Sequence, residues 1–195
     1  MIGVLGGAFN PPHIGHLVFA REAASALGLE RVLLMPAGEA PHRRIEPEPG
    51  AEVRLEMVRL AARDDDVLEA SDLEVRRDGP SYTFRTLELL HEERPGDELT
   101  FLMGADVAAS LETWRRPERV LELAGVGVAV RPGTELDEAE VVLERLGARR
   151  VEVIKMPELG VSSTRIRRRV GEGRPIRYLV PDSIAALIAE RGLYR

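Results

Sequence analysis

Short apolar runs alternate along this chain with longer stretches in which apolar residues recur every three or four positions. The short runs are predicted strands: 2–6, 31–36, 72–77, 98–104, 125–130 and 151–156. The longer stretches are predicted helices: 14–27, 51–62, 82–94, 105–113, 117–124, 137–146, 163–171 and a last helix that ends at Gly192. Because strand–helix–strand units build parallel sheets, the alternation predicts an α/β fold. We expect a doubly wound, mostly parallel sheet with helices on both faces and a C-terminal helical segment.

The composition limits the size, location and chemistry of the protein. Its 195 residues, of which 44% are hydrophobic, predict one domain spanning 1–195. Since no apolar run is long enough to cross a bilayer and no signal-peptide pattern opens the chain, we expect a cytoplasmic protein without a membrane partner. The absence of cysteine excludes disulfides and thiolate metal sites, and the net charge of −6 argues against a nucleic-acid partner.

The first predicted strand runs directly into GGAFNPPHIGH, residues 6–16. Gly6 and Gly7 let a ligand approach the backbone, and the helix that follows directs its free N–H groups and positive dipole end at the same place. His13 and His16 are three residues apart, so both lie on one face of the first helical turn and both can donate to phosphoryl oxygens. The stretch therefore predicts a phosphate site.

Other interpretations of this stretch fit less well. The only lysine, Lys155, lacks the GxxxxGK[ST] context of a Walker A loop, and the first turn lacks the GxGxxG dinucleotide fingerprint. Two histidines could begin a zinc site, but no third ligand accompanies them at a zinc-binding spacing, so no protein-bound metal is predicted. Histidines that merely decorate a helix start are the bland alternative, and the neighbouring glycines and prolines disfavour it.

A second polar group is VSSTRIRRR, residues 161–169. Ser162 or Ser163 can cap a helix here, Thr164 adds a hydroxyl, and Arg167 follows in the first turns. Cations near a helix N-terminus oppose its dipole, so the arrangement is unfavourable unless an anion binds there. A solvated basic face or an RNA patch is the alternative for such a charge run by itself. The pairing with the first turn favours a shared polyphosphate site.

These two stretches carry a family resemblance. GGAFNPPHIGH resembles the GGxFxPxHxGH signature of the nucleotidylyltransferase superfamily, and VSSTRIR resembles its (I/V)SSTxxR signature. From end to end the chain is similar to the bacterial nicotinate-nucleotide adenylyltransferase family. Five segments of this chain resemble segments of that family in the same order: APHR, PSYTFRTL, FLMGAD, TWRRP and VPDSIAALIAERGLY. Arg43 departs from the lysine usual there, and Arg115 follows Trp114 where an aromatic residue is common. The resemblance implies a Rossmann-like fold and adenylyl transfer from ATP to nicotinate mononucleotide, giving deamido-NAD and pyrophosphate.

The resemblance also implies roles on the ATP side. His16 would stabilise the transferring group, His13 would assist in binding the ATP phosphates, and Arg167 would complete the catalytic set. The implied ATP site consists of Gly6, Gly7, Phe9, His13, His16, Gly104, Asp106, Ser162, Ser163, Thr164 and Arg167. Mg²⁺ would arrive with ATP and bridge its phosphates. Asp106 would accept a hydrogen bond from an ATP ribose hydroxyl, with capping of a helix start as its alternative.

The implied acceptor site consists of Ala8, His42, Arg43, Ser81, Tyr82, Thr83, Trp114, Arg115 and Arg131. PSYTFRTL places the free amides of a helix start here, and Thr83 adds a hydroxyl, so the site should favour a carboxylate over an amide. Trp114 either stacks on the cationic pyridine ring or is an ordinary core aromatic. Residues 37–50 form either a wall over the site or only a surface loop.

Alternative functions stay open at this point. Within the superfamily, the acceptor could be nicotinamide mononucleotide or phosphopantetheine, and cytidylyl transfer is a more distant alternative. A nucleotide- or RNA-binding module that has lost catalysis belongs to a different class, against which His16 and Arg167 argue. The sequence does not decide whether the protein forms a homo-oligomer.

Overall fold

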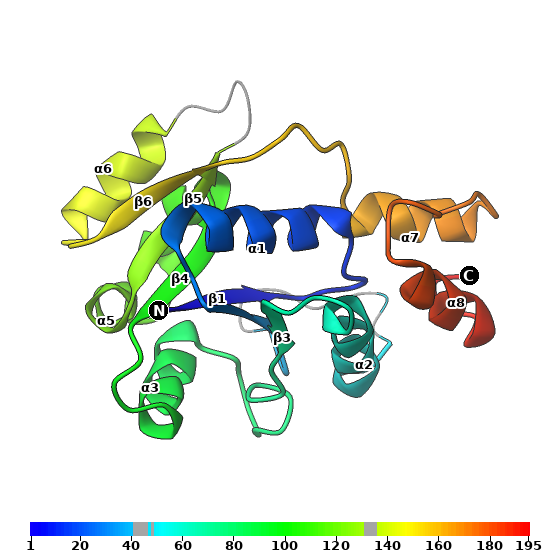
Figure 1. Ribbon diagram of the computed structural model, residues 1–195, viewed down its shortest axis with the longest axis horizontal. Helices are drawn as coiled ribbons and strands as arrows, with labels where there is room; N and C mark the ends of the chain where they lie inside the picture. Colours follow the sequence, from blue (N-terminus) through cyan, green and yellow to red (C-terminus); the bar gives the residue numbers. More distant parts are fainter. Residues whose placement is uncertain (41–46, 48, 131–135) are drawn as a thin grey trace.

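The structure is a computed structural model that describes residues 1–40, 47, 49–130 and 136–195. A six-stranded parallel sheet in the order β3-β2-β1-β4-β5-β6 forms its centre (Figure 1). The strands are β1 (Ile2–Gly7), β2 (Arg31–Pro36), β3 (Leu68–Ala70), β4 (Leu99–Gly104), β5 (Gly125–Val130) and β6 (Val151–Lys155). Because β1 pairs with β2 on one side and with β4 on the other, the strand order reverses at β1.

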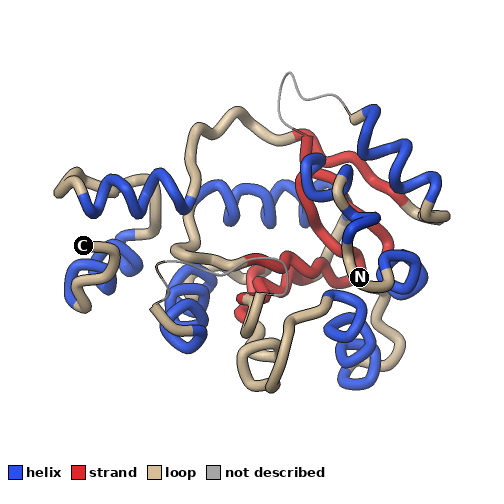
Figure 2. The backbone as a smooth tube through the Cα atoms, turned by 180° about the vertical axis from the view of Figure 1, so that it is seen from behind, coloured by secondary structure: helices blue, strands red, loops and turns tan. Residues whose placement is uncertain are grey.

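Helices enclose the sheet, as Figure 2 shows. The described residues form α1 (Ile14–Leu27), α2 (Ala51–Ala62), α3 (Thr83–Glu93), α4 (Ala105–Ala109), α5 (Pro117–Leu123), α6 (Asp137–Arg145), α7 (Ser163–Gly171) and α8 (Asp182–Glu190), with a 3-10 turn at Leu111–Thr113. Helices α1 and α2 pack on one face of the sheet, and α3 to α6 pack on the other. The predicted doubly wound α/β fold is therefore confirmed. Among the described residues, no helix combines the length and apolar character that a membrane span needs.

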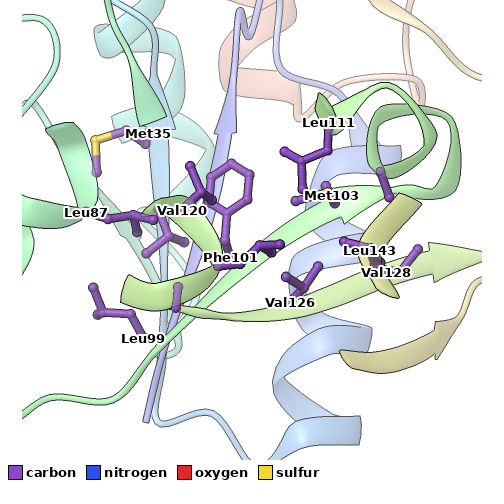
Figure 3. Close-up of a cluster of buried hydrophobic side chains, with 14 of the residues drawn as sticks. Met35, Leu87, Leu99, Phe101, Met103, Leu111, Val120, Val126, Val128 and Leu143 are labelled. Atoms are coloured by element: carbon purple, nitrogen blue, oxygen red, sulfur yellow. The ribbon is translucent and has the colours of Figure 1, made fainter. Parts of the chain in front are cut away.

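Apolar side chains fill the space on both faces of the sheet. On the side of α3 to α6, Phe101 and Met103 of β4 meet Leu87, Leu111 and Val120 from the surrounding helices (Figure 3). On the other side, small residues of α1 let that helix lie close to the strands: Ala20, Ala23 and Ala24. Each fully buried large apolar side chain stabilises the fold by about 1.5–3 kcal/mol. The two layers thus fix the strand ends that the site uses.

A third apolar cluster joins the C-terminal helices to α2. Ile166 of α7 and Ile184 and Ile188 of α8 are buried together with Met57 of α2. In Figure 1, α7 and α8 lie at the end of the molecule where α1 begins. The C-terminal segment is therefore placed beside the loop after β1, although the two are far apart in the sequence.

Two predicted elements differ from the structure. The third strand is β3 at Leu68–Ala70, so the strand predicted at 72–77 is wrong. At 72–77 the chain turns instead, because the Arg76 amide bonds to the Asp72 carbonyl at 2.9 Å, a helix-like spacing that no extended strand allows. The helix predicted at 105–113 is divided at Ser110 into α4 and the 3-10 turn. Local apolar content predicted both stretches, but pairing and packing decided their form.

Candidate active site

The carboxyl ends of the central strands open into a cavity of ≈ 870 Å³. Open α/β sheets bind ligands outside the carboxyl ends of strands where the strand order reverses. The volume lies towards the upper end of the usual range for small-molecule sites, roughly 300–1,000 Å³. Most predicted site residues line it: Gly6, Gly7, Ala8, His13, His16, Ser81, Tyr82, Thr83, Gly104, Asp106, Trp114, Arg115 and Ser162. The structure thus brings residues from both ends of the chain to one cavity.

The first turn is shaped by the start of α1. His13 is the N-cap, with extended backbone (φ −142°, ψ 169°), and the helix begins at Ile14. Gly15 is tightly surrounded, because a Cβ there would lie 3.0 Å from His13 Nδ1 and 3.0 Å from Val161 Cγ1. Glycine therefore allows the segment before α7 to approach the histidine pair closely. At the start of α1 the Ile14 amide donates to the Leu179 carbonyl at 3.0 Å and the His16 amide donates to the His13 carbonyl at 2.9 Å. The helix therefore offers the cavity its positive dipole end rather than a set of free amides.

The rings of His13 and His16 stack, with centroids 3.7 Å apart and planes 20° apart. The His13 backbone N–H donates to His16 Nδ1 at 3.2 Å, so the neutral His16 ring carries its proton on Nε2. Burial, and secondly the charge of His13, hold the pKa of His16 well below its ordinary value of 6.5. His16 is consequently a neutral imidazole near pH 7, able to donate one hydrogen bond from Nε2.

Phe9 is placed differently from the other predicted ATP-site residues. Its side chain is 1% exposed and belongs to the core on the α1 side of the sheet. Its ring centroid lies 4.9 Å from that of His16, at an angle of 56°. Phe9 thus packs against the His16 ring and does not line the cavity.

The C-terminal motif holds the first turn by hydrogen bonds to its carbonyls. Ser162 caps α7 by accepting from the Arg165 amide at 3.2 Å. Ser163 Oγ donates to the Pro11 carbonyl at 2.8 Å, and Arg167 donates to the Asn10 carbonyl at 2.7 Å. A second Arg167 nitrogen donates to Thr164 Oγ1 at 3.3 Å. Ser163 and Arg167 therefore direct donors at the loop after β1. These two residues and Thr164 are not part of the described cavity lining.

Asn10 connects four segments of the chain, a role that the sequence did not predict. Its carbonyl accepts from Arg167, and its side-chain amide donates to the Pro47 carbonyl at 2.8 Å. Tyr194 donates its hydroxyl to Asn10 Oδ1 at 2.5 Å. Asn10 is only 2% exposed. Its hydrogen bonds tie the C-terminus and the loop before α2 to the first turn.

The opposite wall of the cavity is the start of α3. Tyr82 is the N-cap and Thr83 the first helical residue. The Arg85 amide donates to the Tyr82 carbonyl at 2.9 Å, so Thr83 and Phe84 carry the first-turn amides that have no intrahelical acceptor. Trp114 also lines this wall, and its ring meets Phe101 edge-on with centroids 6.0 Å apart. The Arg115 guanidinium lies 5.1 Å above the centre of the Tyr82 ring. Trp114 is thus both a core aromatic and a cavity residue, and Arg115 faces the cavity.

The end of β4 supplies the side of the cavity between these walls. Gly104 is the N-cap of α4, and Asp106 is an exposed residue of its first turn. Asp106 is therefore not the cap, which leaves its carboxylate available to a ligand hydroxyl. The described residues contain no group of three or more His, Cys, Asp or Glu side chains that could hold a metal ion. His42, Arg43 and Arg131 lie outside the described residues.

Sequence reasoning missed a buried polar group beneath the acceptor wall. Glu74 and Thr86 line the cavity, and Arg54 of α2 is fully buried. Arg54 did leave a signal, because it falls on the same helical stripe as the buried Val58 and Ala62, at positions i, i+4 and i+8. A charged residue on an otherwise apolar stripe indicates a buried polar role.

Comparisons with known proteins agree with this geometry. The family model described as Cytidylyltransferase-like matches residues 4–169. A Roseiflexus sp. (strain RS-1) protein named probable nicotinate-nucleotide adenylyltransferase is 45% identical over 196 residues, covering 100% of this chain and 98% of its own. A protein of the same name from Roseiflexus castenholzii (strain DSM 13941 / HLO8) is 46% identical over 200 residues, covering 99% and 97%.

A solved structure of Plasmodium falciparum nicotinic acid mononucleotide adenylyltransferase complexed with NaAD shares the fold. Its TM-score is 0.81 at 16% identity, over 99% of this chain and 96% of that one. With the family model matching most of the chain and two relatives matching nearly all of it, the chain belongs to the cytidylyltransferase-like family, among its nicotinate-nucleotide adenylyltransferases.

Proposed function

We propose that the protein transfers the adenylyl group of ATP to nicotinate mononucleotide, giving deamido-NAD and pyrophosphate. One observation carries the proposal: a single cavity has the His13–His16 pair and the α1 N-terminus on one side, and the α3 N-terminus with Trp114 on the other. The first side suits a polyphosphate, and the second suits an aromatic ring that bears a carboxylate. The relatives named as nicotinate-nucleotide adenylyltransferases support the same reaction.

The reaction needs positioning and charge stabilisation rather than a protein nucleophile. The phosphate of the mononucleotide is ionised near neutral pH, since its second pKa is about 6, so no general base is required. One of its oxygens attacks the α-phosphorus of ATP in line. The new P–O bond forms as the bond between the α-phosphorus and the bridging oxygen breaks, and pyrophosphate leaves with those electrons. Negative charge grows on the α-phosphoryl oxygens and on the leaving group.

Two sets of donors meet that charge. The α1 N-terminus and the Nε2–H of His16 would meet the α-phosphate, and the fold orients them before a substrate binds. Arg167 and Thr164 would bind the β and γ phosphates, while Ser163, whose hydroxyl donates to the Pro11 carbonyl, would hold the loop beside them. Arg167 has five N–H donors and can therefore hold the Asn10 carbonyl and a phosphate at the same time.

Mg²⁺ fits this arrangement as a companion of ATP. The described residues offer no metal-binding cluster, so the phosphates of ATP and water would supply most of its ligands. When bound, the ion would neutralise charge on the phosphates. Asp106, exposed at the cavity, is the carboxylate positioned for an ATP ribose hydroxyl.

On the acceptor side, the carboxylate of nicotinate would meet the free amides at the start of α3 and the hydroxyl of Thr83. Trp114 would stack on the pyridinium ring, and Arg115 would add positive charge at the rim. An amide in place of the carboxylate would present two N–H donors to a group of donors, which disfavours nicotinamide mononucleotide.

The acceptor preference is tested by pyrophosphate release from ATP with nicotinate mononucleotide, nicotinamide mononucleotide and phosphopantetheine side by side. We expect the highest kcat/KM with nicotinate mononucleotide, a reduced preference in Thr83→Val and weaker binding of both mononucleotides in Trp114→Ala. An equal or higher kcat/KM for nicotinamide mononucleotide would overturn the assignment of this wall while leaving adenylyl transfer standing. Release only with phosphopantetheine would move the protein to another member of the superfamily.

Three further expectations from the sequence remain proposals: a cytoplasmic location, the lack of a nucleic-acid partner, and one domain over 1–195.

A further inference from the structure

A carboxyl group is buried beneath the acceptor wall, where the reaction has no use for a base. Glu74 is only 7% exposed and lies in the turn after β3. Burial raises the pKa of this carboxyl, and hydrogen bonds from Thr86 and Ser81, with the nearby charges of Arg77 and Arg54, act in the opposite direction. A buried carboxyl is costly unless such partners compensate it. Contacts with four side chains therefore offset the cost of burying Glu74.

These contacts link Glu74 to one residue before α3 and to one residue in its first turns. Thr86 Oγ1 donates to Glu74 Oε1 at 2.5 Å from one turn inside the helix, and Ser81 is a second hydroxyl partner just before the helix. Arg77 adds a bond across the same turn by donating to the Pro80 carbonyl at 2.8 Å. The chain from Glu74 to Thr86 thus folds back on itself, so that two of its hydroxyls bond to the Glu74 carboxyl.

The same group continues towards the ATP side. The Gly38 amide donates to Ser81 Oγ at 3.0 Å, and the Gly38 carbonyl accepts from Arg54 at 3.2 Å. Arg54 also donates to the Ala8 carbonyl at 3.0 Å in the loop after β1. A Cβ on Gly38 would lie 2.3 Å from the Glu74 carbonyl oxygen, so only glycine allows this approach. A continuous polar path therefore runs from Ala8 through Arg54, Gly38 and Ser81 to Glu74.

We propose that Glu74 is a positioning residue for the acceptor: through Thr86, Ser81 and the Gly38–Arg54 link, it fixes the start of α3 relative to the loop after β1. The inference rests on the proposed function, because it assigns the start of α3 to the mononucleotide. Glu74 accepts the protons of both hydroxyls, so the residue before α3 and the first turn of α3 are held against the same buried carboxyl. The ATP side is held separately by α7, through Ser163 and Arg167. Loss of the Glu74 contacts should therefore weaken the mononucleotide and spare ATP.

The experiment measures binding apart from turnover. Trp114 is the only tryptophan and lines the cavity, so its fluorescence can report nicotinate mononucleotide binding without ATP. We expect Thr86→Val and Glu74→Gln to raise the Kd of nicotinate mononucleotide about 10-fold, with the Kd of ATP within about twofold of wild type. Thr86→Ser keeps the hydroxyl and should restore wild-type binding.

A matched control separates positioning from stability. Thr100 of β4 is as buried as Thr86, at 3% against 2% exposure, and lies outside this polar path, so Thr100→Val should leave both ligands unaffected. The proposal is wrong if Thr86→Val and Glu74→Gln change only the melting temperature, if ATP and the mononucleotide weaken equally, or if Thr86→Ser fails to rescue. Should Glu74→Gln not fold, the Thr86 pair decides the matter alone.

The two proposals fail differently in this experiment. A wild-type protein that binds the mononucleotide but transfers no adenylyl group would refute the proposed function, and the fluorescence comparison would still test Glu74. Wild-type turnover with unchanged Kd values in the variants would refute the role of Glu74 alone.

Discussion

The start of α1 and the start of α3 face the same cavity, but the fold holds them by different means. At α1, donors from the far end of the chain bind loop carbonyls: Ser163 holds Pro11, Arg167 holds Asn10, and Tyr194 holds the Asn10 side chain. At α3, a buried carboxyl accepts from the helix itself and from the residue before it. The first arrangement places a guanidinium with several donors beside the loop that borders the cavity. The second uses the hydroxyls of Thr86 and Ser81 to hold a buried carboxyl.

This difference suits the two ligands. A polyphosphate carries several charges and gains from a guanidinium, which has enough N–H donors to bond to the loop and to the ligand at once. A single carboxylate on a ring needs a few fixed amides and no competing acceptor. The α1 side should therefore respond to loss of individual side chains through rate and ATP binding, and the α3 side through acceptor choice.

The largest expected effect is at the α1 side. His16→Ala should lower kcat by on the order of 10²–10³, because it removes a preoriented donor to the charge that develops on the transferring group. Steady-state kinetics with both substrates measure this, and the melting temperature should change little. His91→Ala, on α3 and bonded at 2.8 Å to the Leu123 carbonyl, is the matched control and should keep full kcat. A His16→Ala protein that retains more than about a third of wild-type kcat would remove His16 from this role.

A smaller effect is expected from Arg167, whose guanidinium bonds to the Asn10 carbonyl and is also assigned to ATP. Arg167→Ala should weaken ATP about 10-fold or more and AMP within about twofold, since the guanidinium is assigned to phosphates that AMP lacks. Calorimetric titration with the two nucleotides measures both affinities. Arg168→Ala, one residue later and exposed, is the control and should leave ATP binding near wild type. Equal weakening of ATP and AMP would assign Arg167 to holding the Asn10 carbonyl alone, and the two sides would then differ less than we infer.

The smallest effect is on stability, and it should have opposite signs on the two sides. The lowered pKa of His16 means that the unfolded chain takes up the proton first as the pH falls below 6.5, so the native state loses stability there. The raised pKa of Glu74 means that the native state holds its proton longer, so stability contributed at low pH is lost as the pH rises above 4.5.

Denaturant unfolding across pH 4 to 8, with His16→Gln and Glu74→Gln as variants that cannot titrate, measures both slopes as differences from wild type. Neither slope should exceed about 1.4 kcal/mol per pH unit, the limit for one proton. Slopes of the same sign for the two variants would contradict this contrast between the α1 side and the α3 side.

Much of the fold follows from local sequence. Apolar runs bounded by glycine and proline predicted five of the six strands near their observed bounds, and Gly28, with φ 63°, ends α1 where the pattern stops. The third strand was misplaced because β3 has only three residues, too few for alternation to appear, while 72–77 has strand-like composition. The turn at 72–77 contains Glu74, which accepts a hydrogen bond from Thr86 of α3. No local pattern in the sequence reveals such a distant contact.

The site divides in the same way. GGAFNPPHIGH and VSSTRIRRR stood out as candidate phosphate sites because each combines a helix start with donors at fixed spacing, and helix starts are local structures. The sequence alone thus predicted a mostly parallel α/β sheet, five of its six strands and two candidate phosphate-binding segments.

Only the tertiary structure decided how those segments meet and what stands behind them. It placed α7 on α2 through an apolar cluster, which aims Ser163 and Arg167 at the loop after β1. It also buried Arg54 and Glu74 among carbonyls and hydroxyls contributed by three separate segments. A buried charge is tolerated only where distant partners surround it, so its role follows from the three-dimensional arrangement rather than from its neighbours in the chain.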